Sequence, residues 1–468
     1  MSRWDSVVLR SGPLSATVFL PGGKNAYYRS SRFDHGTMVG DLKLGQTTIF
    51  PSNFWKCGSG LEQRPHDPED PESGVGLASE WGCGDSGHLC APGWGQAGTT
   101  TLNGVLGFAD ANAGEPFLKI GVGKLVKSSC TACAGLGTSP DDELYKSCAW
   151  LHGCTLYQFN SPYQFFEPPI WKSTQRSDSQ IDFHHAASLD TARGRMGYRI
   201  RRTVSLRDAS SVVVETEVTN IGEHAFRTPF YSHHFFSVNR RPTGPPLELT
   251  MGDLDLRNYT EPLAPSPTIP KKDWSEPLAG YFAVGERGGW LRGTKPVGNH
   301  SRIKAVFAHP LGGSKGKWGV RSAGEVSVDV TLSGPLPLCV AVGSRTSLSR
   351  ADLTVGTCVA LLTHPVTALC CAARRYAYNL YVEERTLSPE PVHMIQLQPG
   401  QSANLTHTVA LRTPASLAAF SPHRTSKGVS SGGAGDIPPR KARGKRRGYM
   451  RRYMHLRRLA ERRSHRRA

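Results

Sequence analysis

Hydrophobic and polar residues alternate with a period of two over much of the first 411 residues. Residues 211–219 (SVVVETEVT) show this alternation clearly, which is typical of a half-buried β-strand. Asn220 and Gly222 follow and tolerate the left-handed backbone of a turn. A second extended run, residues 226–238, carries the polar stretch YSHH between phenylalanines. Titratable side chains inside an apolar strand are costly unless they are paired or used, so this run is the first candidate site.

The same pattern predicts many further strands. We expect them at residues 6–9, 16–20, 38–44, 47–50, 117–126, 154–160, 195–206, 247–256, 303–308, 326–332, 338–342, 355–362, 376–383, 393–397 and 403–411. Turn sequences at residues 45–46, 207–210 and 398–401 join neighbouring strands. Helical periodicity is nearly absent from the body, with one short run at 368–373. Strands that outnumber helices so heavily predict an all-β fold, an antiparallel sandwich or barrel.

Composition agrees with many short strands joined by turns, because the 468 residues include 50 Gly and 33 Pro. Residues 62–73 and 82–98 are expected to form long loops. No run of about eighteen apolar residues predicts a membrane-spanning helix. The first residues have no apolar core typical of a secretory signal, so we expect a cytoplasmic protein.

The positive charge is concentrated at the C-terminal end. Residues 421–468 contain sixteen Lys and Arg against two acidic residues, so they carry +14 of the net +18. We therefore expect one domain over residues 1–415 and a disordered linker with a basic tail over 416–468. The tail has helical spacing of Tyr449, Tyr453 and Leu456, which favours a helix on an anionic partner, either nucleic acid or a membrane surface. A nuclear import receptor and a simple solvated extension are the alternatives.

The eleven cysteines are scattered, and the default without a signal peptide is reduced thiols. Cys130 and Cys133 have the spacing of half a zinc site, and Cys148 with Cys154 would be loose further ligands. Loop thiols are the favoured interpretation, and no metal or cofactor is expected.

Four segments carry a resemblance to a known superfamily and span about residues 16–411. They are residues 27–34 (YYRSSRFD), 76–82 (GLASEWG), 218–220 with 231–236 (VTN, YSHHFF), and 385–391 with 398–400 (RTLSPEP, QPG). Together, in this order, they resemble the galactose mutarotase-like superfamily, which includes the aldose 1-epimerases, and are most similar to a microbial branch of it. The resemblance implies a large antiparallel β-supersandwich and an isomerase that interconverts sugar anomers.

In aldose 1-epimerases a glutamate takes the proton of the anomeric hydroxyl while a histidine protonates the ring oxygen across the sugar ring. The resemblance assigns these roles to Glu390 and His233. It assigns sugar or sugar-phosphate binding to Arg32, Glu80, Tyr231 and Trp81. The sequence departs from the branch at His234, where Asn is usual, at Trp81, where Phe is usual, and at Ser232, where Asp is common.

Plain structural interpretations stay open for each of these residues. His233 would be a buried core histidine, Glu390 a loop carboxylate, Arg32 a partner of Asp34 or Glu80, and Glu80 itself a surface residue. His234 should face away from His233, since neighbours in a strand alternate. The functional alternatives are a non-catalytic carbohydrate-binding module and a polysaccharide lyase or glycoside-processing relative on the same fold.

Overall fold

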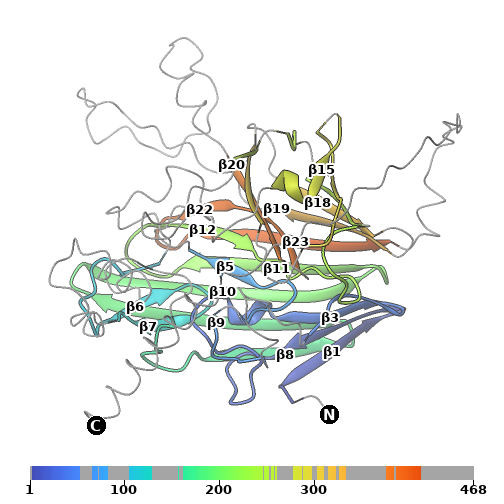
Figure 1. Cartoon of the computed structure of the whole chain (residues 1–468). Coiled ribbons are helices and arrows are strands. Elements are labelled where there is room, and N and C mark those ends of the chain that lie inside the picture. Colours follow the sequence, from blue (N-terminus) through green and yellow to red (C-terminus); the bar gives the residue numbers. More distant parts are fainter. Residues whose placement is uncertain are drawn as a thin grey trace, which may run out of the picture.

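The described part of the molecule is built almost entirely from β-strands (Figure 1). The computed structural model describes residues 3–52, 66–71, 73–82, 105–128, 157, 162–245, 247–251, 254–257, 259–260, 278–286, 288–297, 303–309, 315–322, 326–333, 376–383 and 386–412. Within these ranges the only helices are two 3₁₀ turns, η1 (His35–Thr37) and η4 (Leu278–Gly280). The all-β prediction is therefore confirmed.

Ten antiparallel strands form the largest sheet. In spatial order they are β15 (Phe282–Val284), β16 (Leu291–Gly293), β13 (Leu247–Thr250), β18 (Lys315–Ser322), β19 (Val326–Ser333), β23 (Ser402–Arg412), β11 (Ser211–Asn220), β10 (Gly194–Arg207), β9 (Gln180–Thr191) and β8 (Trp171–Ser177).

Smaller sheets are formed by the other strands. One contains β1 (Ser6–Ser11), β2 (Leu14–Phe19), β3 (Val39–Leu44) and β4 (Thr47–Phe50); a second contains β22 (His393–Leu397), β12 (Phe226–Ser232) and β5 (Ser79–Trp81); a third contains β14 (Tyr259–Thr260), β17 (Ile303–His309), β20 (Tyr376–Glu383) and β21 (Thr386–Pro391); the last pairs β6 (Pro116–Lys119) with β7 (Gly123–Val126).

One face of the ten-stranded sheet forms the core. Because strand neighbours alternate, every second residue of β10 and β11 is buried, for example Val204 and Val212. One part of this face packs against β1–β4 and the β14–β17–β20–β21 sheet, and another part packs against β5, β12 and β22. The molecule is thus a sandwich, and the three short strands lie beside β10 and β11 in Figure 1.

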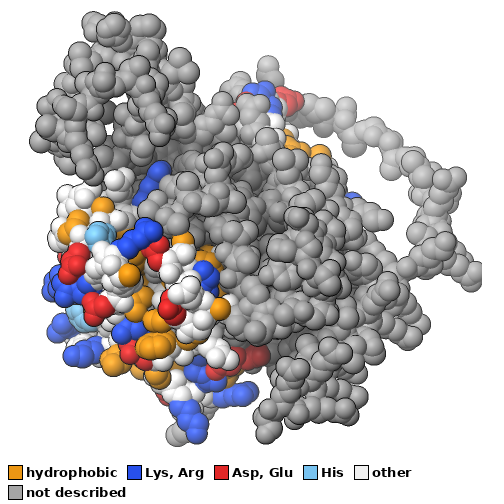
Figure 2. Space-filling model, turned by 90° about the vertical axis from the view of Figure 1, so that its left-hand side faces the viewer, with side chains coloured by type: hydrophobic (Ala, Val, Ile, Leu, Met, Phe, Trp, Pro, Cys, Tyr) orange, Lys and Arg blue, Asp and Glu red, His pale blue; other side chains and the backbone are white. Residues whose placement is uncertain are grey.

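Charged side chains on the outer surface are mixed in sign. On the face in Figure 2, Lys and Arg side chains lie next to Asp and Glu side chains instead of in one patch. The pairs Arg201–Glu217 and Arg207–Glu215 cross from β10 to β11 on the outer face. This agrees with a body that carries only +4 of the net charge of +18.

The predicted turns are confirmed where the structure describes them. Gly222 donates its N–H to the side-chain oxygen of Asn220 at 2.9 Å. The hairpin after residue 44 turns at Gly45, which has a φ of 61°, and the loop between β22 and β23 turns at Gly400, which has a φ of 77°. Glycine adopts such positive φ values without steric cost.

Other predicted elements are corrected by the structure. The expected strand at 117–126 is a hairpin, because Gly121 and Gly123, with φ of 76° and 121°, reverse the chain between β6 and β7. The run 226–238 ends as a strand at Ser232. The sequence does not predict eight of the strands: β5, β8, β9, β14, β15, β16, β18 and β21. Strand β8 escapes prediction because it is a polar, exposed edge strand without apolar alternation.

Several predictions fall on residues outside the described ranges. They include all eleven cysteines, the strands at 338–342 and 355–362, the short helical run at 368–373 and the basic tail. The domain boundary at residue 415 likewise stays a prediction. Among the described residues no helix is long and apolar enough to cross a membrane.

A buried ion pair joins the two layers of the sandwich. Arg202 on β10 points into the core and donates to both carboxylate oxygens of Asp34, at 2.8 and 2.7 Å. Both side chains are fully buried. The Nε–H of Arg202 donates to Thr216 on the neighbouring strand β11 at 3.0 Å. Burying two charges is costly, and this fork geometry offsets the cost.

We expect Arg202→Met to destabilise the fold by about 3–5 kcal/mol, because it leaves the Asp34 carboxylate buried without its cation. The matched control is Arg207→Met on the same strand, whose pair with Glu215 is half exposed and should cost less than about 1 kcal/mol. Denaturant unfolding of both variants measures the difference. Equal losses in the two variants would show that the pair does not hold the layers together.

Candidate functional site

The candidate site is built on the three-stranded sheet β5–β12–β22. Tyr231 on β12 lies directly opposite Glu80 on β5, so both side chains are on the same face. After β12 the chain stays beside the segment that precedes β5, since His233 N–H donates to the Ala78 carbonyl at 2.7 Å. Phe236 then pairs with Leu387 of β21, which brings residues 231–236 beside the strand that carries Glu390.

His233 and Glu390 are in contact. His233 Nε2 lies 3.5 Å from Glu390 Oε1, with 5% of the histidine side chain and none of the glutamate side chain exposed. The imidazole stacks on Phe235 at a ring distance of 4.4 Å. Ser388 donates its hydroxyl to Glu390 Oε1 at 2.9 Å, and β21 fixes the backbone of both residues. Glu390 is thus a buried strand residue, and the loop interpretation is wrong.

Glu80 is fully buried beside this pair and is surrounded by donors. Its Oε2 accepts from Arg32 Nε at 2.9 Å and from the Tyr231 hydroxyl. Its Oε1 accepts from Lys119 Nζ at 3.1 Å. Lys119 also bonds to the hydroxyl of Tyr157. The surface interpretation of Glu80 is therefore wrong, and of the two partners considered for Arg32 it is Glu80 that the guanidinium contacts.

Burial changes the ionisation of the groups around Glu80. Burial, opposed by the Glu80 charge, lowers the pKa of Lys119 to about 8. Burial and then the Glu80 charge raise the pKa of Tyr231 well above its usual value, and the Glu390 charge adds to this. The influence of Glu390 on Tyr231 means that the Glu80 cluster and the His233–Glu390 pair share one electrostatic environment. Tyr231 is a neutral donor in it.

Trp81 does not lie with the other candidate residues. Because it follows Glu80 in β5, its side chain points to the opposite face. The indole is fully buried, packs on Phe230 and donates Nε1–H to Asp34 at 2.8 Å. A sugar has no access to this ring, so Trp81 is a core residue that supports the Asp34–Arg202 pair.

His234 faces away from His233, as predicted. Its Nδ1–H donates to the Pro389 carbonyl at 2.9 Å, so in the neutral ring Nε2 is the acceptor. His407 on β23 donates to that Nε2 at 2.9 Å. Burial lowers the pKa of His407 to about 4, and burial and then His407 hold the pKa of His234 well below its usual value. The pair is a neutral structural bridge between the layers.

Ser232 occupies the position at which the similar microbial branch commonly has an aspartate. Its hydroxyl is fully buried and donates to the Leu77 carbonyl at 3.2 Å. The serine therefore stabilises the chain preceding β5. Because this hydroxyl bonds to Leu77, the contact does not support a role for Ser232 as hydrogen-bond partner of the His233 imidazole.

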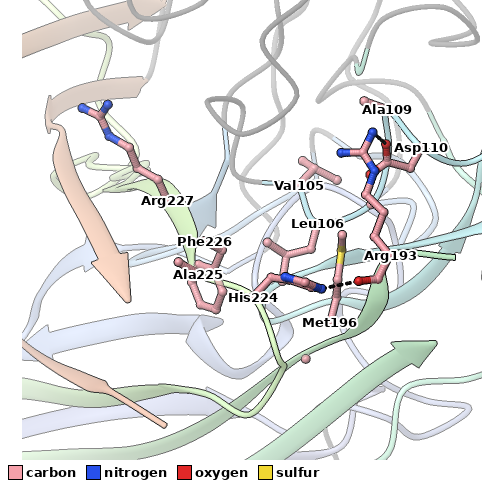
Figure 3. Close-up of a pocket in the computed structure, with 12 residues that line it drawn as sticks. Val105, Leu106, Ala109, Asp110, Arg193, Met196, His224, Ala225, Phe226 and Arg227 are labelled. Carbon is pink, nitrogen blue, oxygen red and sulfur yellow. Dashed lines mark hydrogen bonds and ion pairs between the residues drawn. The ribbon is translucent and has the colours of Figure 1, made fainter. Parts of the chain in front are cut away.

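The described residues also line a cavity of about 220 Å³ away from the His233–Glu390 pair. Leu106, Met196 and Phe226 give it an apolar wall, and none of the predicted site residues lines it (Figure 3). Arg193 pairs with Asp110 at 3.0 Å, His224 donates to the Arg193 carbonyl, and Arg227 also lines the cavity. None of the residues that the resemblance assigns to catalysis lines it, so we place the candidate chemistry at His233 and Glu390.

No metal centre is evident in the described ranges, which contain no group of three His, Cys, Asp or Glu that could hold an ion. The cysteines considered for zinc lie outside them.

Sequence reasoning missed Lys119, Arg202 and His407, and it considered Asp34 only as a possible partner of Arg32. Arg202 and His407 occupy inward positions of strands β10 and β23, where an apolar residue is the rule. A charged or polar residue at a position where the alternation requires an apolar one can be recognised in the sequence. Lys119 gives no such indication, because the sequence predicts one continuous strand over residues 117–126.

No family model and no curated protein matches the sequence. Solved structures that are similar to the described chain include a GalM/aldose epimerase homologue from C. elegans (10% identity, 88% of this chain and 99% of that one, TM-score 0.35). Another is a galactose mutarotase-like protein from Lactobacillus casei (9% identity, 87% of this chain and 100% of that one, TM-score 0.35). A third is a galactose 1-epimerase from Lactobacillus acidophilus (10% identity, 86% of this chain and 93% of that one, TM-score 0.34).

Acid should destabilise the protein well above the pH at which carboxylates titrate. Burial lowers the pKa of His35, His393 and His407 to about 4, so between about pH 6.5 and 4 the unfolded chain binds more protons than the folded one. The free energy of unfolding should then fall as pH decreases through this window, by about 2 kcal/mol per histidine from pH 7 to pH 5. Denaturant unfolding at several pH values measures the slope. His407→Gln should make it shallower by about 1.4 kcal/mol per pH unit, and a stability that is flat from pH 7 to 5 would contradict the buried neutral state.

Proposed function

We propose that this chain is a carbohydrate-active protein, an aldose 1-epimerase-like isomerase in which His233 and Glu390 are the acid and the base. The observation that carries the proposal is the 3.5 Å contact between these two groups, which are far apart in the sequence. A general acid and a general base must both be within hydrogen-bond reach of the atoms they serve. A donor-rich cluster, Arg32, Glu80 and Tyr231, beside the pair is suited to hold sugar hydroxyls.

In the proposed reaction the Glu390 carboxylate accepts the proton of the anomeric hydroxyl. The bond between the anomeric carbon and the ring oxygen breaks as the carbonyl forms, and the protonated His233 gives its proton to the ring oxygen. Rotation of the aldehyde and the reverse transfers produce the other anomer. Histidine is suited to this role because its ordinary pKa is near neutral pH.

The contact differs from the arrangement that the resemblance implies, in which the sugar ring lies between the two groups. The anomeric hydroxyl and the ring oxygen are bonded to the same carbon, so a sugar that presents this edge can reach an acid and a base that are close together. In the proposal the sugar oxygens therefore enter at the edge of the pair and replace the direct contact.

A non-catalytic carbohydrate-binding protein is the second candidate. The nearly complete burial of both side chains favours it, because a pair that a ligand does not reach transfers no proton to it. A lyase is disfavoured, since it would need a tyrosine that gives up its proton easily, whereas burial raises the pKa of Tyr231.

Polarimetry of a fresh solution of a pure aldose anomer tests the isomerase. We expect the protein to speed its equilibration, and His233→Ala and Glu390→Gln to reduce kcat by about 10²–10⁴-fold, which is the usual contribution of a general acid or base. His184→Ala, a half-buried histidine of β9 outside the site, is the matched control and should keep the wild-type rate. Unchanged kcat in both site variants would remove the assignment.

Calorimetry separates the two candidates. If the chain only binds sugar, titration of the wild type with an aldose should give heat while polarimetry shows no acceleration. Arg32→Met should then weaken binding by about tenfold or more, because one charge-assisted hydrogen bond is lost. Binding that is unaffected by Arg32→Met would contradict a sugar site at this cluster.

A further inference from the structure

Lys119, at the end of β6, is an unusual residue of the core. It is completely buried, and lysines are almost never buried unless they are paired. Its ammonium donates to Glu80 Oε1 at 3.1 Å and to the Tyr157 hydroxyl, and it lies 5.1 Å from the centre of the Tyr157 ring. Neither the motifs of the sequence nor the proposed reaction uses it.

The position of Lys119 lets it act on the site through one shared carboxylate. Glu80 Oε2 accepts hydrogen bonds from Arg32 and Tyr231, whereas Oε1 accepts one from Lys119. Among the described residues Lys119 is the partner of that oxygen. Loss of its charge would leave Oε1 buried and poorly compensated, and the carboxylate would rotate toward its remaining donors. Arg32 and Tyr231, which both donate to Glu80 Oε2, would move with it.

We propose that Lys119 is a positioning residue of the site, whose ammonium group locks Glu80 and thereby Arg32 and Tyr231 in the arrangement that receives the sugar. The inference rests on the proposed function, because it assigns Lys119 a part in the same site.

The titration behaviour of Lys119 supports this role. Burial lowers its pKa to about 8, while the Glu80 charge acts in the opposite direction. The charged and titratable groups that face it come from several elements: Glu80, Arg32, Asp34, His35, Tyr157 and Tyr231. Both tyrosines have pKa values raised well above the usual one, and burial lowers that of His35 to about 4. Lys119 is therefore the group of this set that changes charge near pH 8.

The decisive comparison is the pH profile of anomer equilibration for wild type and three variants. Wild type should lose kcat/KM above about pH 8. Lys119→Met should lower kcat/KM by about 100-fold at pH 7, a loss typical of a misplaced binding group, and Lys119→Arg should recover most of it without the alkaline decline. Lys124→Met on β7, whose lysine forms a partly exposed pair with Glu167, is the matched control and should behave as wild type. An alkaline decline that persists in Lys119→Arg, or a Lys119→Met variant as active as wild type, overturns the proposal.

A direct measurement of the lysine keeps the inference separate from the isomerase assignment. In protein labelled with carbon-13 at the lysine ε position, the NMR signal that disappears in Lys119→Arg should titrate with a midpoint near pH 8. Glu80→Gln should move this midpoint lower, because the Glu80 charge favours the protonated lysine. If wild type accelerates no anomer equilibration, the proposed function fails, and sugar affinity by calorimetry over the same pH range replaces kcat/KM. A Lys119 signal that titrates at the ordinary value of about 10.4 overturns the inference in either case.

Discussion

The rest of the described structure depends on the ion pair and the hydrogen bonds of the buried Asp34 carboxylate. It lies between the two layers and accepts both guanidinium N–H groups of Arg202, the indole N–H of Trp81 and the backbone N–H of Gly36. A buried charge is tolerated only when it is paired and hydrogen-bonded, so these four donors fix where the segment around Asp34 can lie. That segment also carries Arg32, and its place in the site follows from the position of Asp34.

Strand β5 transmits this constraint to the candidate site. It has only three residues, and because neighbours alternate, Trp81 points to Asp34 while Glu80 points to Arg32, Lys119 and Tyr231. A shift by one residue would put the carboxylate in the apolar cluster and the indole among the charges. The structural ion pair and the site cluster therefore fix the same register, and neither is independent of the other.

The sequence predicts the class of fold well and the site only in part. Alternation in residues 211–219 and the turns at Gly45 and Gly400 are local signals, and local signals were enough to find most described strands. The edge strand β8 lacks alternation because both of its faces are mostly exposed. His233 and Glu390 could be named from their motifs, but their contact, the burial of Trp81 and the part played by Lys119 depend on which strands lie opposite each other. That pairing joins residues far apart in the chain, and a period of two cannot encode it.

The balance of charges around the pair bears on which proposed function is physically easier. With His233 protonated, as the proposed reaction requires, the described cluster has three cations, Arg32, Lys119 and His233, against the two carboxylates Glu80 and Glu390, so its net charge is small. In a buried site the cost of moving a proton grows with the distance over which charge is separated. In the proposed reaction one proton passes from a sugar to Glu390 while His233 gives one up, so the total charge is unchanged and charge shifts only between two neighbouring groups. An acid and a base that lie this close are thus suited to concerted acid–base exchange at one edge of a sugar, which is the physical reason to test the isomerase first.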